Sequence, residues 1–196
     1  MIKSLFLLPV LALAIADVPP SGLRRAADTE SYTIDVTHSM VVFKCKHFGV
    51  SNNYGRFNDI SGKFSFDDKD ASKCAIEMEV KTESIDTNLP DRDKHLRSAD
   101  FLNAKQFPTA TFKSKTIKPT GKDTYEVTGD FTLCGVTKSV TVTANHIGTG
   151  KDPYGNIRRG FELAFTIKRS EYGMKKMLEG IGDDVHLMIN IEGTRK

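Results

Sequence analysis

The sequence has no tryptophan and only three cysteines, and no two cysteines have the Cys-x-x-Cys spacing of thiol redox enzymes. It also lacks a strong charge of either sign, because 28 Lys and Arg residues face 25 Asp and Glu residues. No long basic run is present, so we expect no nucleic-acid partner. Glycine and proline are close to average, which excludes collagen-like and low-complexity chains. The apolar fraction of 39% suffices for one folded core.

Long hydrophobic runs are also missing. The longest extends from Leu5 to Ala16, whereas a membrane-spanning helix needs about 20 apolar residues. Lys3 precedes this run and small residues end it, which predicts a signal peptide over residues 1–16. Residues 17–31 include Pro19-Pro20-Ser21-Gly22, which predicts a flexible or extended lead-in to one domain over residues 32–196. We therefore expect a periplasmic or secreted protein with no permanent membrane anchor.

The three cysteines allow three alternative single disulfides in an exported protein. Cys45 and Cys74 lie in apolar alternating stretches, which favours two buried free thiols. Cys134 precedes a glycine at the expected end of a strand and is the candidate for a reactive thiol. A redox or stress-response role through these cysteines therefore remains an alternative function.

Alternation of apolar and polar residues is the main signal in the rest of the chain and predicts antiparallel strands. Phe57 and Phe64 have opposite parity, which predicts a bulge near residues 60–62. Proline and acidic residues in a first turn predict one helix over residues 90–102. The clearest strands are 74–81, 125–133, 139–145, 161–168 and 185–192, the weaker ones are 32–36, 41–48 and 110–117, and turns are expected at 52–55, 119–123 and 152–156.

This pattern predicts an all-β fold with one short helix between strands. A closed or nearly closed antiparallel eight-stranded barrel is favoured over a sandwich, which stays open as the alternative. The distinction matters because a sandwich fills its centre with its own side chains, whereas an eight-stranded barrel can hold one small ligand. The expected inward positions carry almost no charge, so any such ligand is expected to be apolar.

Nine short segments, taken in order, resemble the YceI-like family of exported lipid-binding proteins. They are Asp35–Ser39, Val42–Ser51, Gly55–Phe57, Thr87–Asn88, Arg92–Phe101, Pro108–Ser114, Gly129–Leu133, Gly135–Lys138 and Arg169–Met174. The resemblance implies a lipocalin-like barrel that holds a long isoprenoid or similar amphiphile in the periplasm. The expected ligand is a quinone, a polyprenyl phosphate or a fatty amide.

The barrel interpretation makes the inward apolar residues the wall of a ligand cavity. The predicted wall residues are Phe43, Phe57, Phe64, Ile76, Met78, Val80, Phe112, Val127, Phe131, Val142, Phe161 and Phe165. Apolar walls select weakly among ligands, so a few polar groups must choose the head group. The candidates for this role are His47, Arg92, His95 and Arg169, with Arg97 beside them in the same motif. Arg92 and Asp93 could equally serve only to cap the helix.

No catalytic or metal-binding constellation stands out. His38 and Ser39 are adjacent, so their side chains would point to opposite faces of a strand and His38 could not easily activate Ser39. His47 and His146 have inward parity, but no His-x-His or His-x-x-x-His pair occurs, and we expect no metal. We expect a non-catalytic carrier, with no cofactor other than its lipid. An enzyme that modifies a lipid, with His47 or His95 as acid or base, is an alternative.

The expected partners follow from this assignment. They are a hydrophobic lipid ligand, transient contact with a membrane and, at most, a second copy of the chain in a homodimer. Release of the ligand would require movement of the loops at the mouth of the barrel, over residues 90–103 or 148–159.

Overall fold

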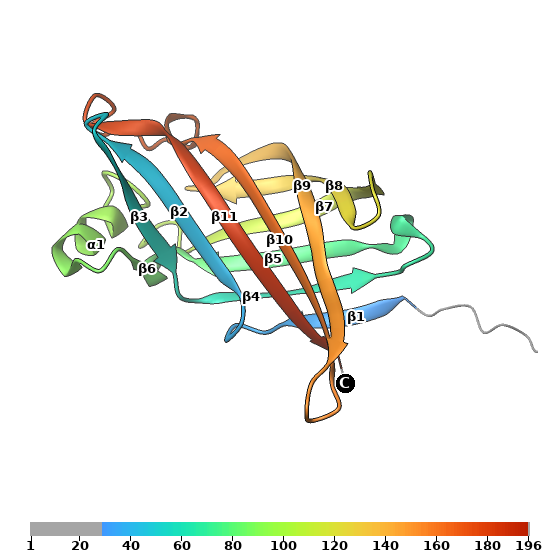
Figure 1. Cartoon of the computed structure of the whole chain (residues 1–196). Helices are drawn as coiled ribbons and strands as arrows, with labels where there is room; N and C mark the ends of the chain where they lie inside the picture. The colour runs from blue at the N-terminus through green and yellow to red at the C-terminus, as the bar shows by residue number, and fades with distance from the viewer. Residues whose placement is uncertain (1–28, 196) are drawn as a thin grey trace, which may run out of the picture.

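The computed structural model describes residues 29–195, which fold mainly as β strands around one long axis (Figure 1). The strands are β1 (Glu30–Ile34), β2 (Met40–His47), β3 (Ser51–Phe57), β4 (Ile60–Phe66), β5 (Ala75–Lys81), β6 (Ile85–Asp86), β7 (Thr109–Pro119), β8 (Thr124–Leu133), β9 (Val136–Lys151), β10 (Ile157–Lys168) and β11 (Ile181–Arg195). One α-helix, α1 (Pro90–Arg97), and three 3-10 turns, η1 (Ala71–Lys73), η2 (Thr82–Ser84) and η3 (Arg169–Tyr172), complete the fold. Within this range no helix is long and apolar enough to cross a membrane.

The predicted signal peptide, residues 1–16, lies outside the described residues, as does most of the predicted lead-in. The end of that lead-in is structured, because Glu30 and Ser31 already belong to β1 and pair with Phe66 and Ser65 of β4.

The strands form a closed antiparallel barrel, as predicted, because β11 pairs with β1 as well as with β10. Three positions around the barrel are each occupied by two short strands in succession. β1 and β2 share the first position, and both pair with β11. β4 and β3 share the second position, where β4 pairs with β1 and β3 pairs with β2. β5 and β6 share the third position, where β5 pairs with β4 and β6 pairs with β3. Counted in this way, the eleven strands occupy eight positions, which is the number predicted from the sequence.

The barrel has two unlike ends. At one end, called here the helix end, β3 pairs with β6 only through Arg56 and Phe57, and residues 87–108, called here the lid, cover the interior beside β3 and β6 (Figure 1). At the other end, called here the closed end, lie the loops that join β4 to β5, β7 to β8 and β9 to β10. The cavity described below therefore has one end framed by a helical segment and one framed by hairpins.

Three local predictions need correction. The helix ends at Arg97 rather than Leu102, because Ser98 is extended and its backbone N–H and hydroxyl both donate to the carbonyl of His95. Asn52–Gly55 is strand rather than turn. The turn precedes it at Phe48 and Gly49, where φ is +47° and +71°. The alternation of inward and outward side chains shifts at Asn58 and Asp59, between β3 and β4, rather than at the predicted residues 60–62. The backbone N–H groups of Asn58 and Asp59 both donate to the Ser84 hydroxyl there.

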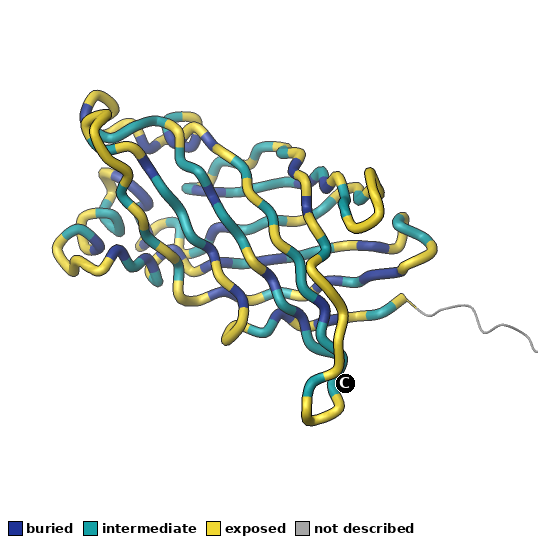
Figure 2. Tube along the Cα trace, in the orientation of Figure 1, coloured by how far each residue is buried: buried dark blue, intermediate teal, exposed yellow. Residues whose placement is uncertain are grey.

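Buried residues recur along most of the strands (Figure 2). Those near the closed end include an aromatic cluster. Tyr32 and Phe64 stack with ring centroids 4.8 Å apart, and Phe64 meets Phe161 edge to face. Such pairs contribute about 0.5–1.5 kcal/mol beyond the area they bury. This cluster packs directly beneath the seam between β1 and β11 and thus stabilises closure.

Gly193 on β11 allows this packing. A Cβ atom at this position would lie 2.3 Å from the Phe64 ring and 2.9 Å from Tyr32. We expect Gly193→Ala to lower the free energy of unfolding by about 1–3 kcal/mol, the usual cost of overpacking. Gly148→Ala is the control, because a Cβ there meets nothing within 4 Å. Urea unfolding measures both, and equal stability of the two variants would show that the seam tolerates a methyl group.

Candidate functional site

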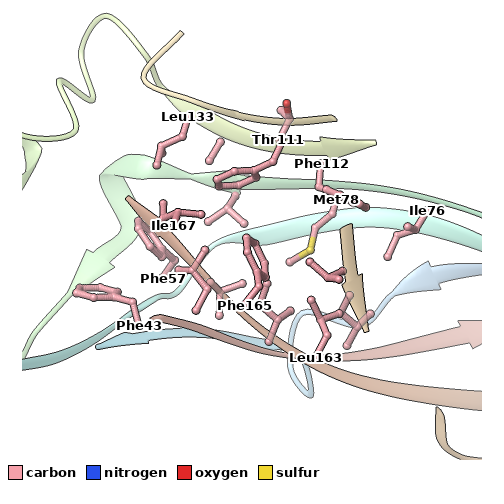
Figure 3. Close-up of a pocket in the computed structure, with 18 of the residues that line it drawn as sticks. Phe43, Phe57, Ile76, Met78, Thr111, Phe112, Leu133, Leu163, Phe165 and Ile167 are labelled. Atoms are coloured by element: carbon pink, nitrogen blue, oxygen red, sulfur yellow. The ribbon is translucent and has the colours of Figure 1, made fainter. Parts of the chain in front are cut away.

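A cavity of about 210 Å³ runs along the inside of the barrel (Figure 3). This is far above the ~10–15 Å³ that a single water requires. Every residue predicted for the apolar wall, from Phe43 to Phe165, lines it. Their contact with a ligand stays a prediction. The alternation of each strand was sufficient to find these positions, because it fixes which face of the strand points inward.

The lining is almost wholly apolar. Among the described lining residues only Ser65, Thr111, Tyr125 and Arg169 carry oxygen or nitrogen in their side chains. The Thr111 hydroxyl points away from the apolar cluster in Figure 3. Cavities of this composition stay dry and take up apolar molecules, because water would lose its hydrogen bonds inside. The arrangement therefore suits a hydrocarbon chain.

Arg159 blocks the closed end. Its side chain is 4% exposed, and its guanidinium lies 4.2 Å from the centroid of the Phe66 ring. Asp68 accepts two hydrogen bonds from it at 3.1 Å, and Glu30 lies 3.8 Å away. The Arg159 side chain thus covers the aromatic cluster at this end, held by the Phe66 ring on one side and by the more exposed Asp68 carboxylate on the other.

The lid covers the helix end and contributes Leu96, Phe101 and Leu102 to the cavity lining. The Arg97 guanidinium holds it in place by donating to the backbone carbonyls of Glu83 at 2.7 Å and Ile85 at 2.8 Å. These three lid residues were not predicted to line the cavity, because their helix and turns have no strand alternation that reveals an inward face.

Arg92 and Asp93 fix the start of the lid rather than line the cavity. The Asp93 carboxylate is buried and accepts hydrogen bonds from the backbone N–H and hydroxyl of Thr87. Arg92 donates to the same Thr87 hydroxyl at 2.7 Å and to the Thr87 carbonyl at 2.6 Å. No side chain caps the helix, so the capping role considered in the sequence is not observed, and both residues bond Thr87 instead.

The histidine candidates also lie outside the cavity lining. His95 sits on the lid surface with Nε2 3.0 Å from the Asp100 carboxylate. His47 ends β2 with its ring against Phe48. His146, expected to point inward, packs against Phe66 and Phe161 near the closed end and lies 3.4 Å from Asp123. The structure therefore does not gather the predicted head-group residues at one place.

Arg169 is the predicted polar residue that does line the cavity. It is 3% exposed at the start of η3, where its guanidinium donates to the carbonyls of Met174, Ile181 and Gly182 at 2.8–3.0 Å. Burial lowers the pKa of Arg169, yet a guanidinium stays protonated in proteins. No described carboxylate forms an ion pair with it. Arg169 thus lines the cavity while each of its three guanidinium nitrogens donates to a neutral backbone carbonyl.

The cysteines are free and largely buried, as expected for Cys45 and Cys74. The assignment of Cys134 as the reactive thiol is wrong. Burial raises the pKa of Cys134 to about 11, and its sulfur points at the carbonyls of Phe101 and Leu102. Burial also raises the pKa values of Cys45 and Cys74. Thiolates are the reactive form, so none of these sites favours thiol chemistry.

The carboxylates of Asp35 and Glu192 and the His38 ring lie within 4.8 Å of one another beside the β1–β2 loop. Arg158 occupies this cluster, with Nη1 2.5 Å from Asp35 and 2.6 Å from Glu192. Hydrogen bonds from His38 and Arg158 lower the pKa of Asp35. The Ser39 hydroxyl bonds the backbone of Glu192 rather than His38. The Arg158 guanidinium thus already occupies the position between these carboxylates, and no nucleophile and base are aligned here.

Comparisons with known proteins agree with this architecture. A family model described as "YceI-like domain" matches residues 32–193. A UPF0312 protein of Pseudomonas aeruginosa is 46% identical over 178 residues, covering 90% of this chain and 91% of the relative. The crystal structure of a Campylobacter jejuni YceI protein matches with a TM-score of 0.70 and 32% identity, covering 77% of this chain and 90% of that one. A polyisoprenoid binding domain from Saccharophagus degradans shares the fold, with a TM-score of 0.66, 17% identity and coverage of 84% and 98%.

Burial of the thiols makes a testable prediction. We expect the native protein to react very slowly with a thiol reagent at pH 8, because all three pKa values are raised and little thiolate forms. Denatured protein should react rapidly at all three positions. Spectrophotometric titration of released reagent measures both states. One fast thiol in the native protein would contradict the prediction, and Cys134→Ser would identify whether it is Cys134.

Proposed function

Because the chain belongs to the YceI-like family, we propose that it is a non-catalytic carrier that binds a long isoprenoid or similar amphiphilic lipid inside the barrel. The observation that carries this proposal is the apolar cavity along the barrel axis. The fold is shared with a domain named for polyisoprenoid binding, which supports the same class of ligand. A quinone, a polyprenyl phosphate and a fatty amide all combine a long tail with a small polar head.

The energetics of tail burial support a carrier. Each buried CH₂ group contributes about 0.8 kcal/mol. At the lower efficiency of larger ligands, about 0.3 kcal/mol per heavy atom, a chain of ~30 atoms gains ~9 kcal/mol, or sub-micromolar affinity. Burial of the part of the tail that the cavity accommodates can therefore contribute to holding the lipid without any covalent step.

We place the polar head at the helix end and the tail towards the closed end. Arg169 lines the cavity at the helix end and lacks an ion-pair partner among the described residues, so an anionic head group would supply its counter-charge. Arg159 at the closed end is already paired with Asp68 and Glu30. An apolar tail needs no further polar partner there.

An enzyme acting on the same lipid has less support. His47 and His95 were the candidate acid and base, and neither lines the cavity that would hold the substrate. The cluster of Asp35, His38 and Arg158 lies outside the cavity lining, and its carboxylate is already held by Arg158.

We also propose that the carrier acts outside the cytoplasm, in the periplasm. The support is the signal-peptide pattern of residues 1–16. Cell fractionation with an antibody against residues 32–196 would test it, and a purely cytoplasmic, unprocessed protein would contradict it.

A cavity-filling variant tests the proposed function. Native mass spectrometry of the purified protein, followed by organic extraction, should reveal a prenyl or acyl lipid. Ala144→Phe places a ring in the cavity and should reduce bound lipid at least fivefold, while the fold is kept because a buried void is filled. Ala164→Phe on the outer face of β10 is the matched control and should keep normal occupancy. Equal occupancy in both variants would contradict binding in the barrel.

The head-group assignment makes a separate prediction. With the tail length held constant, a polyprenyl phosphate should bind about tenfold more tightly than the corresponding prenol, because only the phosphate pairs with Arg169. Fluorescence competition against a prenyl probe measures the ratio. Equal affinities would show that the three carbonyl partners of Arg169 already satisfy its charge.

A further inference from the structure

Two loops at the helix end expose apolar side chains at their tips. They are the β2–β3 turn, which carries Phe48 and Val50, and the loop over residues 173–180, which carries Met177 and Leu178. These four residues are called here the apolar tip. Val50 is 84% exposed and Phe48 is 61% exposed, whereas residues of these types are usually buried. Large exposed apolar groups that occur together mark an interaction site.

The two loops form one unit. The backbone N–H of Phe48 donates to the carbonyl of Gly180 at 2.7 Å. The Phe48 ring packs on Gly180 so closely that a Cβ atom there would lie 2.9 Å from it. Figure 1 shows the two loops side by side, remote from the β9–β10 loop near the C-terminus. The apolar side chains therefore project from a single connected surface.

The backbone of the apolar tip is held in a conformation that ordinary side chains rarely adopt. Phe48 has φ of +47° and Met177 has φ of +56°, the left-handed region favoured by glycine and asparagine. The Met177 carbonyl accepts hydrogen bonds from Gly180 and Ile181, which fix this geometry. Strained residues that the surrounding structure keeps in place occur mainly at functional positions.

The apolar tip is continuous with the helix end of the cavity. Met174 and Ile181, which flank Met177 and Leu178 in the chain, line the cavity and offer their carbonyls to Arg169. Leu89, at the start of the lid, is also exposed. A surface that contacts the apolar tip would therefore lie against the end where we place the head group.

Basic residues flank the apolar tip. Lys46 precedes the β2–β3 turn, and Lys175 and Lys176 precede Met177. Neither Lys46 nor Lys175 forms an ion pair with any described residue, and Lys176 lies 3.7 Å from Asp100. Glu179 lies in the same loop and Asp183 and Asp184 follow it, so the lysines next to the apolar tip that no ion pair with a described residue engages are Lys46 and Lys175. Apolar groups ringed by lysine match an anionic lipid surface, where the apolar groups enter the acyl boundary and the lysines meet the head groups.

We propose that the apolar tip docks the helix end of the barrel on an anionic lipid bilayer. The inference rests on the proposed function, because a carrier of a water-insoluble lipid must exchange it with a membrane. Docking at this end would let the lipid pass between bilayer and cavity beside the lid without crossing bulk water. The four residues of the apolar tip are far fewer than the roughly 20–30 residues per side of a standard protein interface, which favours a bilayer over a protein partner.

Vesicle flotation tests the proposal. The wild-type protein should float with vesicles of phosphatidylcholine and phosphatidylglycerol at low ionic strength, and less with phosphatidylcholine alone. The double variant V50D and M177D should lower the partition coefficient at least tenfold. The matched control, I147D and Y154D, places the same charges on exposed apolar residues of β9 and the β9–β10 loop and should stay within twofold of wild type.

A second measurement separates this proposal from the proposed function. Uptake of a prenyl probe delivered from cyclodextrin needs the cavity but no bilayer, and the tip variant should keep it. Normal uptake by wild type without binding to either vesicle would overturn membrane docking and leave the carrier function intact. Equal vesicle binding by the tip and control variants would also overturn it. V50D alone changes a residue that is 84% exposed. It should give a smaller loss of vesicle binding, and this loss does not depend on the stability of the 173–180 loop.

Discussion

Pairing of β11 with β1 is the interaction on which the rest of the structure depends. Only two register pairs, Thr33 with Thr194 and Ile34 with Gly193, join these strands, yet they convert an open sheet into a closed barrel. Closure removes the free edges at this position and forces alternate side chains of every strand into a common interior. The cavity, its apolar lining and the separation of two unlike ends all follow from that seam.

The interior wall was predictable from the sequence because period-two alternation reports directly which side chains share a face. Phe112 and Phe165 were placed correctly without knowing their neighbours. The polar positions were not, since the roles of Arg92 and His95 depend on partners such as Thr87 and Asp100 that folding of the lid supplies. The end of the helix at Arg97 and the burial of Cys134 likewise depend on tertiary contacts that no local pattern records.

Two buried arginines distinguish the two ends of the barrel. Arg159 is surrounded by Asp68, Glu30 and aromatic faces, so its charge is satisfied within the protein. Arg169 is held by three carbonyls, which orient the guanidinium but do not neutralise it. The same residue type thus covers the interior at one end and is the candidate to bind an anionic head group at the other. The difference lies in the charge of the surrounding groups.

The interruption of three barrel positions divides the wall into two unlike halves. Strands β7 to β11 are single strands along one side, whereas β1 with β2, β3 with β4 and β5 with β6 share positions on the other. At the connections the backbone still bonds across the sheet, from the N–H of Asp35 to the carbonyl of Glu192 and from the N–H of Asn58 to the carbonyl of Ser84. Each connection therefore bends a long strand without opening the wall, which lets that position follow the curvature of the barrel.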